Sequence, residues 1–554
     1  MTALATAAPN SPTTKTPRWL SLLFRVLMIV AIGVLAFHAI VYTLYAANLI
    51  QFPFDYDQGE GFELVDTILF SEGQWPYRDT NVFPFYSSNY PPVYHVMAAP
   101  FVWLFGPEYW YGRLLGYLGT LVTAAAIGLA VYREGRIRWI AVAAGLAFLA
   151  SNTVYHIGPL FRQHMTMVMF ETLTVVVLAN VNEISSPGKR RWMLILGLVL
   201  LLCAGYTKQL AVATAAAVLL FLFIRNPRRG ILWGLSFALV GGGIFVWMNA
   251  STNGQWWLQT IAANVNPYIA DQTAGLFRLW FSLHGFLIIP AALLAMFELY
   301  FARLSLYVIW LLAGIGISVL SGKWGAGDSY FATGIAAVCI TSGIFFSKWL
   351  SGNWGSADSR YTRALSPFTR PLRPYLIGAA CLLVPIAYLG YGAATVKMPT
   401  TGAVFGPLAA ALGLQANADN GFYDSAGRIA GGYADIGHFT TPDDVAAGWR
   451  IVERVRAADG PVLSEEAAFT LRAGREVITN PTQLLNLDIN EKFDPTSLVA
   501  MIENQEFGLV ILRASFYPEA VMDAIHDNYT PSETIHMNGF DYELLVPLSG
   551  GGQE

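Results

Sequence analysis

The stretch that follows the first long apolar run is rich in carboxylates. From residue 52 to residue 94 it reads FPFDYDQGEGFELVDTILFSEGQWPYRDTNVFPFYSSNYPPVY. Out of 37 acidic residues in the whole chain, it holds Asp55, Asp57, Glu60, Glu63, Asp66, Glu72 and Asp79. A carboxylate within hydrogen-bond reach of a hydroxyl group can accept its proton during a reaction. Asp55 and Asp57 also offer oxygen ligands of the kind that a divalent cation binds.

Part of this stretch is predicted to be an amphipathic helix. Glu60, Glu63 and Asp66 follow one another at intervals of three residues, which places them on one face of such a helix. A helix face of this kind can also be turned to solvent. The spacing therefore leaves open whether these three carboxylates take part in chemistry.

The complementary charge comes from residues near the ends of later apolar runs. Lysine and arginine bind phosphate, and charged groups at membrane depth are costly, so they usually face an internal cavity. The residues concerned are Arg113, His156, Arg162, His164, Lys208, Gln209, Lys323 and Asp328. Carboxylates and cations that meet on one face would suit an anionic substrate and a base. A structural role for each, such as an ion pair or a helix-end polar group, is the competing interpretation.

Composition indicates the class of protein that must position these residues. Of the 554 residues, 55% are hydrophobic and 13% are charged, and the mean hydropathy is +0.46. Soluble domains carry about 25% charged residues. Apolar runs of about 20 residues recur along the chain, as in helical membrane proteins. No long basic run with interleaved aromatic residues is present, so a nucleic-acid partner is not expected.

Basic clusters between the apolar runs predict the topology, because such clusters mark the cytoplasmic side. About 11 spans fit between them, near residues 19–48, 109–132, 139–153, 160–181, 192–207, 209–224, 231–250, 277–300, 305–320, 329–347 and 374–395. The proline-flanked segment from Pro92 to Gly106 is assigned as an interfacial or re-entrant helix. This arrangement predicts a protein of the plasma (inner) membrane with a cytoplasmic tail at residues 1–18. The acidic loop, residues 51–91, then lies on the outer face.

The C-terminal segment, residues 396–554, differs from the rest in charge and pattern. It holds 22 acidic and 9 basic residues and is predicted to be an extracytoplasmic α/β domain. PVLSEEAAFTLRAGREVIT, residues 461–479, predicts a strand, a helix and a second strand. Residues 507–512 and 541–548 predict further strands, and residues 443–458 have helical periodicity. The transmembrane domain is accordingly placed at residues 19–395.

Several motifs resemble those of the polytopic C-type (GT-C) glycosyltransferases, in particular the protein O-mannosyltransferase and aminoarabinose transferase group. They are the acidic first outer loop, G-x-x-x-Y-R-D at residues 73–79, YPPVYHVMAAPFVWLFG at 90–106 and GRLLGYLGTL at 112–121. YTKQ at 206–209 and GAGDSYF at 325–331 are similar to later motifs of that group. The resemblance covers about residues 19–395.

The resemblance implies a function and a set of site residues. The family transfers a sugar from a polyprenyl-phosphate donor to an acceptor at the outer membrane face, and an acidic residue of the first loop serves as base or positions the acceptor. Asp57 matches that position best, although Asp57-Gln58 stands where members often have Asp-Glu. Asp55 and Glu60 therefore compete with it. Substrate binding is expected from Arg78, Tyr90, Arg113, Arg162, His164, Lys208, Gln209, Lys323, Asp328 and Tyr330, with Arg162, Lys208 and Lys323 on the donor phosphate.

These expectations leave several points open. The acceptor is a lipid, a protein or a glycan, and the sugar is a hexose or a pentose. A divalent cation is possible, with Asp55 and Asp57 as its ligands, but the lipid phosphate is already a fair leaving group. The competing functions are a membrane transporter, which predicts charged residues near the middle of the membrane in paired halves, and a non-catalytic binding or scaffold protein.

Overall fold

Apolar helices dominate the first 395 residues of the computed structural model. The structure describes residues 17–354, 360–418, 420–427 and 437–548. The predicted tail at residues 1–18 therefore lies almost wholly outside the described residues. Within them, seven helices are long and apolar enough to cross a membrane, judged by length and composition. The predicted fold class, a polytopic helical membrane protein with a C-terminal α/β domain, is confirmed.

The helices of the membrane part range from 6 to 35 residues in length. They are α1 (Arg18–Gln51), α2 (Glu60–Ser71), α3 (Val93–Phe105), α4 (Trp110–Gly135), α5 (Arg138–Ala150), α6 (Asn152–Ile157), α7 (His164–Leu178), α8 (Pro187–Gly205), α9 (Val212–Arg225), α10 (Pro227–Ser251), α11 (Gln255–Thr260), α12 (Ala270–Phe301), α13 (Leu306–Ser318), α14 (Ala332–Ser351) and α15 (Arg360–Ala394). Short 3-10 turns connect several of them: η1 (Val181–Glu183), η2 (Gln209–Ala211), η3 (Ala262–Asn264), η4 (Val319–Gly322) and η5 (Asp328–Phe331).

Each of the predicted spans coincides with a helix. Seven of them correspond to the helices of membrane-spanning length and apolarity, in α1, α4, α7, α10, α12, α14 and α15. The remaining four correspond to α5, α8, α9 and α13, which are shorter or begin with a basic cluster. The number of spans thus stays a prediction. The segment from Pro92 to Gly106 is helical, as α3, and its depth in a membrane stays a prediction too.

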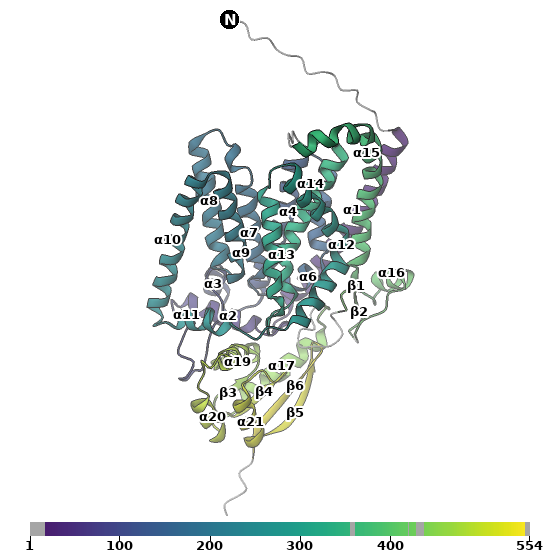
Figure 1. Cartoon of the computed structure of the whole chain (residues 1–554). Helices are drawn as coiled ribbons and strands as arrows, with labels where there is room; N and C mark the ends of the chain where they lie inside the picture. Colours follow the sequence, from purple (N-terminus) through teal and green to yellow (C-terminus); the bar gives the residue numbers. More distant parts are fainter. Residues whose placement is uncertain (1–16, 355–359, 419, 428–436, 549–554) are drawn as a thin grey trace, which may run out of the picture.

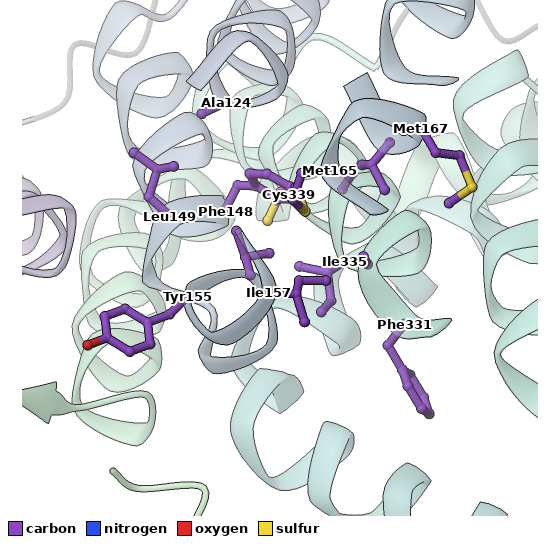
Figure 2. Close-up of a cluster of buried hydrophobic side chains, with 14 of the residues drawn as sticks. Ala124, Phe148, Leu149, Tyr155, Ile157, Met165, Met167, Phe331, Ile335 and Cys339 are labelled. Carbon is purple, nitrogen blue, oxygen red and sulfur yellow. The ribbon is translucent and has the colours of Figure 1, made fainter. Parts of the chain in front are cut away.

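The packing core of the bundle lies among α4, α5, α7 and α14, which contact one another. Figure 2 shows part of it, with Phe148 of α5, Met165 of α7, and Ile335 and Cys339 of α14 pointing toward one another. All four side chains are buried. Burial of large apolar side chains of this kind is the main stabilising contribution to such a core.

One glycine of α4 lets the next loop approach the helix closely. A Cβ atom at Gly116 would come within 2.7 Å of the carbonyl oxygens of Gly158 and Leu160. Only glycine permits this approach of backbone to backbone. The loop that connects α6 to α7, and with it Arg162, is thereby held against the end of α4.

The C-terminal domain is built on a four-stranded mixed sheet. Its strands β3 (Val462–Ser464), β4 (Leu509–Leu512), β5 (Tyr529–Met537) and β6 (Phe540–Pro547) lie in the order β3-β4-β6-β5. The pair β3 and β4 is parallel, and the other two pairs are antiparallel. Its helices are α17 (Pro442–Ala457), α18 (Ala467–Arg472), α19 (Pro481–Ile489), α20 (Thr496–Glu503) and α21 (Glu519–Asn528). A small hairpin-like pair, β1 (Lys397–Pro399) and β2 (Phe422–Asp424), and helix α16 (Phe405–Leu412) precede it.

Most predicted elements of this domain are present, and one prediction was wrong. The predicted helix at 443–458 is α17, and the strands at 461–464, 507–512 and 541–548 are β3, β4 and β6. The second strand of the 461–479 segment is absent, because residues 475–480 are irregular. Side-chain hydrogen bonds replace a strand ladder there: Thr479 Oγ1 lies 2.8 Å from the Tyr517 hydroxyl, and the Asn480 side chain caps α19.

The C-terminal domain packs against the end of the bundle that carries the acidic loop. Figure 1 shows its sheet below α2, α6 and α11, whereas the first residues of α1 lie at the opposite end of the bundle. Arg472 of α18 forms an ion pair of 2.7 Å with Glu108, which lies just before α4. Backbone and side-chain contacts of this kind fix the domain over the acidic loop.

The two ends of the bundle are predicted to lie on opposite sides of the membrane. Single cysteines at Ser497 and Ser185, both exposed positions, test this arrangement. In intact cells a membrane-impermeant thiol reagent should label Ser497→Cys of the C-terminal domain and leave Ser185→Cys unlabelled until the membrane is permeabilised. The unsubstituted chain gives the background from its native cysteines. Labelling of Ser185→Cys alone would reverse the predicted orientation.

Candidate functional site

A buried ion pair anchors the acidic loop to α4. The guanidinium group of Arg113 donates from Nε to Glu60 Oε1 at 3.0 Å and from Nη2 to Glu60 Oε2 at 2.7 Å. Both side chains are fully buried. Burial alone would raise the pKa of Glu60, but the charge and N–H groups of Arg113 outweigh it and lower the pKa below its ordinary value. Glu60 is therefore a carboxylate with its partners already in place.

Arg113 and Glu60 also form hydrogen bonds with backbone groups of three nearby segments. Arg113 Nη1 donates to the carbonyl of Leu49 at 2.6 Å, and Nη2 donates to that of Phe54 at 2.6 Å. Glu60 accepts from the backbone N–H of Tyr56 at 2.9 Å and from that of Phe161 at 2.6 Å. The end of α1, the start of the acidic loop and the α6–α7 loop thus meet at one ion pair.

Asp57 forms the second ion pair of the loop. Arg162 donates from Nε to Asp57 Oδ2 at 2.8 Å, and its Nη2 lies 2.7 Å from the same oxygen. The side chains of Asp57 and Arg162 keep 14% and 16% of their surface exposed, whereas those of Glu60 and Arg113 are fully buried. Burial lowers the pKa of Arg162, but the charge of Asp57 outweighs it and raises the pKa. Asp57 is the most exposed of the five carboxylates between residues 55 and 66.

Gly59 allows Arg162 to lie against the loop backbone. Its φ of +100° is in the left-handed region, and a Cβ atom there would come within 2.8 Å of Arg162 Nη2. Arg162 also donates to the Gln58 carbonyl and lies 3.3 Å from Glu63 Oε1. Residues 57–63 therefore wrap around one guanidinium group.

Asp55 points to the C-terminal domain. It accepts from the Tyr109 hydroxyl at 3.0 Å and from the backbone N–H of Ala468 in α18 at 3.1 Å. Burial, followed by the nearby charge of Glu60, raises the pKa of Asp55 to about 6. The two candidate cation ligands, Asp55 and Asp57, thus have separate partners, on different elements.

Glu63 and Asp66 lie on the inner face of α2, together with His95 of α3. His95 Nε2 is 3.3 Å from Glu63 Oε2 and 3.8 Å from Asp66 Oδ2. Burial raises the pKa of Glu63 to about 7, against the charge of Arg162. Burial and the charge of Glu63 raise the pKa of Asp66 well above its ordinary value. Within the part of the chain that the structure describes, Glu63, Asp66 and His95 are the group whose ligand atoms lie close enough to hold a metal ion.

Lys208 is a buried cation among aromatic rings. Its Nζ lies 4.9 Å from the ring centre of Tyr90, 5.9 Å from that of Tyr330 and 2.5 Å from His164 Nε2. No carboxylate oxygen of the described residues lies within 4.0 Å of it. Burial first, and then the charge of Arg162, lowers the pKa of Lys208 to about 7. Such a cation lacks the counter-ion that an anionic ligand would supply.

The other predicted substrate-binding residues form hydrogen bonds with other parts of the protein. Lys323 Nζ donates to the Asn264 carbonyl at 2.8 Å, and its charge contributes to the lowered pKa of Lys208. Gln209 donates to the carbonyls of Asn89 and Thr260, and so ties the acidic loop to α11. Arg78 donates to Gln74 at 2.6 Å within the loop itself. Asp328 accepts from Thr153 Oγ1 at 2.9 Å, at the end of α6.

A second polar cluster joins α6 to the segment after α15. His156 Nε2 lies 2.7 Å from Asp424 Oδ2, and Lys397 Nζ donates to the carbonyl of Ala150 at 2.8 Å. Burial lowers the pKa of Lys397 to about 7, against the charge of Asp424. Asp424 and Lys397 were not predicted, since nothing in the local sequence around them distinguishes them from other charges of the C-terminal segment. His95 was also missed, because only the packing of α3 on α2 brings it to Glu63.

Comparison with solved structures identifies the fold. ArnT from Cupriavidus metallidurans in the apo state aligns with a TM-score of 0.52 over 97% of this chain and 99% of that one, at 13% identity. The same protein bound to undecaprenyl phosphate aligns with a TM-score of 0.52 at 15% identity, over the same shares of the two chains. The chain has the fold of ArnT. No family model matches it, and no curated protein is similar to it in sequence.

The likeness to ArnT extends over both domains and confirms, at the level of the fold, the resemblance that the motifs indicated. An archaeal structure, the oligosaccharyltransferase AglB from Archaeoglobus fulgidus in complex with an inhibitory peptide and a dolichol-phosphate, aligns less well, with a TM-score of 0.46 at 12% identity over 95% of this chain and 74% of that one. At these identities the comparison concerns architecture. The roles of individual residues have to be argued from the contacts described above.

The two ion pairs of the loop are predicted to differ in their contribution to stability. Glu60→Gln leaves the buried guanidinium group of Arg113 without a counter-ion, which typically costs about 3–5 kcal/mol. Asp57→Asn affects a pair that is partly exposed, and should cost about 1 kcal/mol or less. Thermal unfolding of the detergent-solubilised variants, followed by size-exclusion chromatography, measures the difference. Equal melting temperatures for the two variants would contradict the anchoring role of Glu60.

Proposed function

We propose that this protein transfers a sugar from a polyprenyl-phosphate donor to a lipid, protein or glycan acceptor at the outer face of the plasma (inner) membrane. Its N-terminus then lies in the cytoplasm and its C-terminal domain outside. The observation that carries the proposal is an apolar groove at the end of the bundle that leads to an unneutralised lysine beside a carboxylate–arginine pair. The ArnT fold supports it, because the C. metallidurans protein has been solved with undecaprenyl phosphate bound.

The groove has the apolar lining that part of an isoprenoid chain needs. It has a volume of about 430 Å³ and is lined almost entirely by apolar atoms. Its lining comes from α2, α3, α8 and α10 and includes Phe70, Val93, Val96, Tyr206 and Met248. An apolar groove among helices of the membrane part takes up part of a lipid chain without loss of hydrophobic contact.

The groove ends close to the proposed phosphate site. Tyr206 lines it two residues before Lys208, and Pro92 lines it two residues after Tyr90, whose ring faces Lys208. A phosphate at Lys208 would meet a buried cation in a site of low dielectric constant, where such attraction is strong. Arg162 and Lys323, whose charges already affect Lys208, are the further cations proposed for the donor phosphate.

Asp57 is the carboxylate that we assign as the base. Glu60 and Asp55 are fully buried and hold their partners on α4 and α18, whereas Asp57 is partly exposed. In the described residues no hydrogen bond reaches Asp57 Oδ1, so this oxygen is available to an acceptor hydroxyl. The acceptor oxygen attacks the anomeric carbon, the bond from that carbon to the phosphate oxygen breaks, and the phosphate leaves with the electron pair. The hydroxyl proton passes to Asp57 and then to water.

Arg162 lies between the proposed base, Asp57, and the proposed site of the donor phosphate. In the structure it is engaged by Asp57, and a donor phosphate would compete for the same guanidinium group. A bidentate fork suits phosphate and carboxylate alike. Donor binding would thus loosen Arg162 from Asp57 and leave the carboxylate oxygens free for the acceptor hydroxyl.

Removal of the proposed base tests the assignment. Asp57→Asn is nearly isosteric and cannot take a proton, so transfer should fall by about 10²–10⁴-fold while donor binding persists. The assay uses purified protein, a panel of radiolabelled polyprenyl-phosphate sugars and analysis of the acceptor fraction. Asp55→Asn and Glu60→Gln, corrected for folded protein, serve as comparisons. A Glu60→Gln variant that folds and is inactive, beside an active Asp57→Asn variant, would move the role to Glu60. Absence of transfer with every donor would overturn the proposed function.

The lowered pKa of Lys208 predicts a pH dependence of donor binding. Without a bound donor, Lys208 has a pKa of about 7. Burial and the charges of Arg162 and Lys323 lower this pKa, and the charge of Glu63 raises it. His164 also lies beside the Lys208 amine. A bound phosphodiester keeps one negative charge and raises this pKa. Above pH 7 binding must therefore take up a proton, and affinity should fall up to tenfold per pH unit until the pKa of the complex is reached.

Two variants at this position separate the charge from its titration. Lys208→Met should bind the phosphodiester donor about 10–100-fold more weakly, the usual worth of a hydrogen bond to a charged group. Lys208→Arg keeps a charge that does not titrate and should remove the pH dependence between pH 7 and 9. The measurement is equilibrium binding of a radiolabelled donor in detergent. A wild-type affinity that stays constant over this range would contradict the role of Lys208.

A further inference from the structure

Three ligand atoms from α2 and α3 face one another in a buried space beside the proposed active site. They are Glu63 Oε2, Asp66 Oδ2 and His95 Nε2, all within 4.8 Å of one another. The side chains of Glu63 and His95 are 3% and 0% exposed, yet Glu63 Oε2 and His95 Nε2 have no hydrogen-bond partner among the described residues. Buried polar atoms almost always have a hydrogen-bond partner, so we expect a proton or an ion between these two atoms.

The hydrogen bonds of Thr67 identify the tautomer of His95. The Thr67 hydroxyl gives its proton to the carbonyl of Glu63 at 2.7 Å. Its oxygen, 3.5 Å from His95 Nδ1, can therefore only accept, which places the ring proton on Nδ1. His95 Nε2 then directs a lone pair at the carboxylate oxygens of Glu63 and Asp66. Lone pairs in this arrangement repel one another unless a proton or a metal cation lies between them.

We propose that Glu63, Asp66 and His95 bind a divalent transition-metal ion such as Zn²⁺. One imidazole and two carboxylates suit such an ion, whereas Mg²⁺ and Ca²⁺ prefer oxygen ligands alone. With metal–ligand bonds of about 2.0–2.2 Å, tetrahedral ligands lie roughly 3.3–3.5 Å apart. The observed separations of 3.3 Å and 3.8 Å from His95 Nε2 need only a small adjustment.

The surroundings hold each ligand in the required orientation. Asp66 Oδ1 accepts from the Tyr86 hydroxyl at 2.8 Å, and the Ser88 hydroxyl donates to Oδ2, which keeps a second lone pair for the metal. The ring of Phe70 stacks on that of His95, with centroids 5.9 Å apart and planes 12° apart. Partners of this kind fix the orientation of metal ligands and raise their affinity.

The site is connected to the proposed base through one side chain. Glu63 would bind the metal through Oε2 while Oε1 stays 3.3 Å from Arg162, the partner of Asp57. Because all three ligands are buried, the metal is assigned a positioning role: it fixes α2 on α3 and holds Glu63 toward Arg162. This consequence for transfer rests on the proposed function, whereas metal binding does not.

Metal binding is tested on the full chain without any donor. The purified protein is stripped with a chelator in detergent, titrated with Zn²⁺, Co²⁺ or Mg²⁺, and its metal content and thermal stability are measured. We expect about one Zn²⁺ or Co²⁺ per chain, a rise in melting temperature, and a visible Co²⁺ spectrum typical of a four-coordinate site. Mg²⁺ should have no such effect. The absence of Zn²⁺ and Co²⁺ binding to the folded wild-type chain would overturn the proposal in favour of a shared proton or ion pair.

Variants locate the site. His95→Gln and Asp66→Asn should bind Zn²⁺ at least about 10-fold more weakly and lose the Co²⁺ spectrum. The matched control is Glu171→Gln, which changes an equally buried carboxyl group whose oxygens accept from Thr214 and Thr333, both at 2.6 Å. It should bind both metals as the wild type does. Unchanged metal affinity in folded His95→Gln and Asp66→Asn would show that the metal lies elsewhere. If the wild-type chain binds Zn²⁺ but transfers sugar from none of the donors, the proposed function is refuted and the metal site is not.

Discussion

The ion pair of Glu60 and Arg113 is the contact on which the rest of the site depends. Two fully buried charges are costly to remove from water, and the cost is offset only when the remaining donors and acceptors are also satisfied. Here the guanidinium group and the carboxylate also bind backbone groups of α1, the acidic loop and the α6–α7 loop. These bonds fix the loop in register with the bundle. Asp57 then meets Arg162, because both residues lie within a few positions of the backbone that the pair holds.

The carboxylates of the loop have different partners, although they are close in sequence. Asp55 accepts from α18 of the C-terminal domain, Asp57 pairs with Arg162, and Glu60 pairs with Arg113. The three-residue spacing of Glu60, Glu63 and Asp66 does place them on one face of α2, but this face is buried, and the interpretation as a solvated face is wrong. The five carboxylates between residues 55 and 66 thus dock the C-terminal domain, anchor the loop and leave Asp57 partly exposed.

The sequence was sufficient for elements with a strong periodic pattern and insufficient for contacts between distant segments. Apolar length predicted the helices, and buried apolar runs predicted β3, β4 and β6. Strand β5 escaped prediction because its polar residues face solvent at an edge and a bulge near Pro531 breaks its alternation. In the site, the basic residues near helix ends were found from charge and hydropathy. The partner of Asp55 could not be found, because it lies 413 residues away in α18, and His95 could not be found, because only the packing of α3 on α2 brings it to Glu63.

Electrostatics connects these partners to the order of events in the proposed reaction. Before a donor is bound, Arg162 is neutralised by Asp57, while Lys208 has no carboxylate within ion-pair distance among the described residues and has a lowered pKa. An incoming phosphate therefore finds Lys208 first, since neutralisation there costs no existing ion pair. As the phosphate then draws Arg162 away from Asp57, the Asp57 carboxylate loses its ion-pair partner and becomes available to the acceptor hydroxyl. A base that is held by an arginine until the donor arrives would favour binding of the donor before the acceptor.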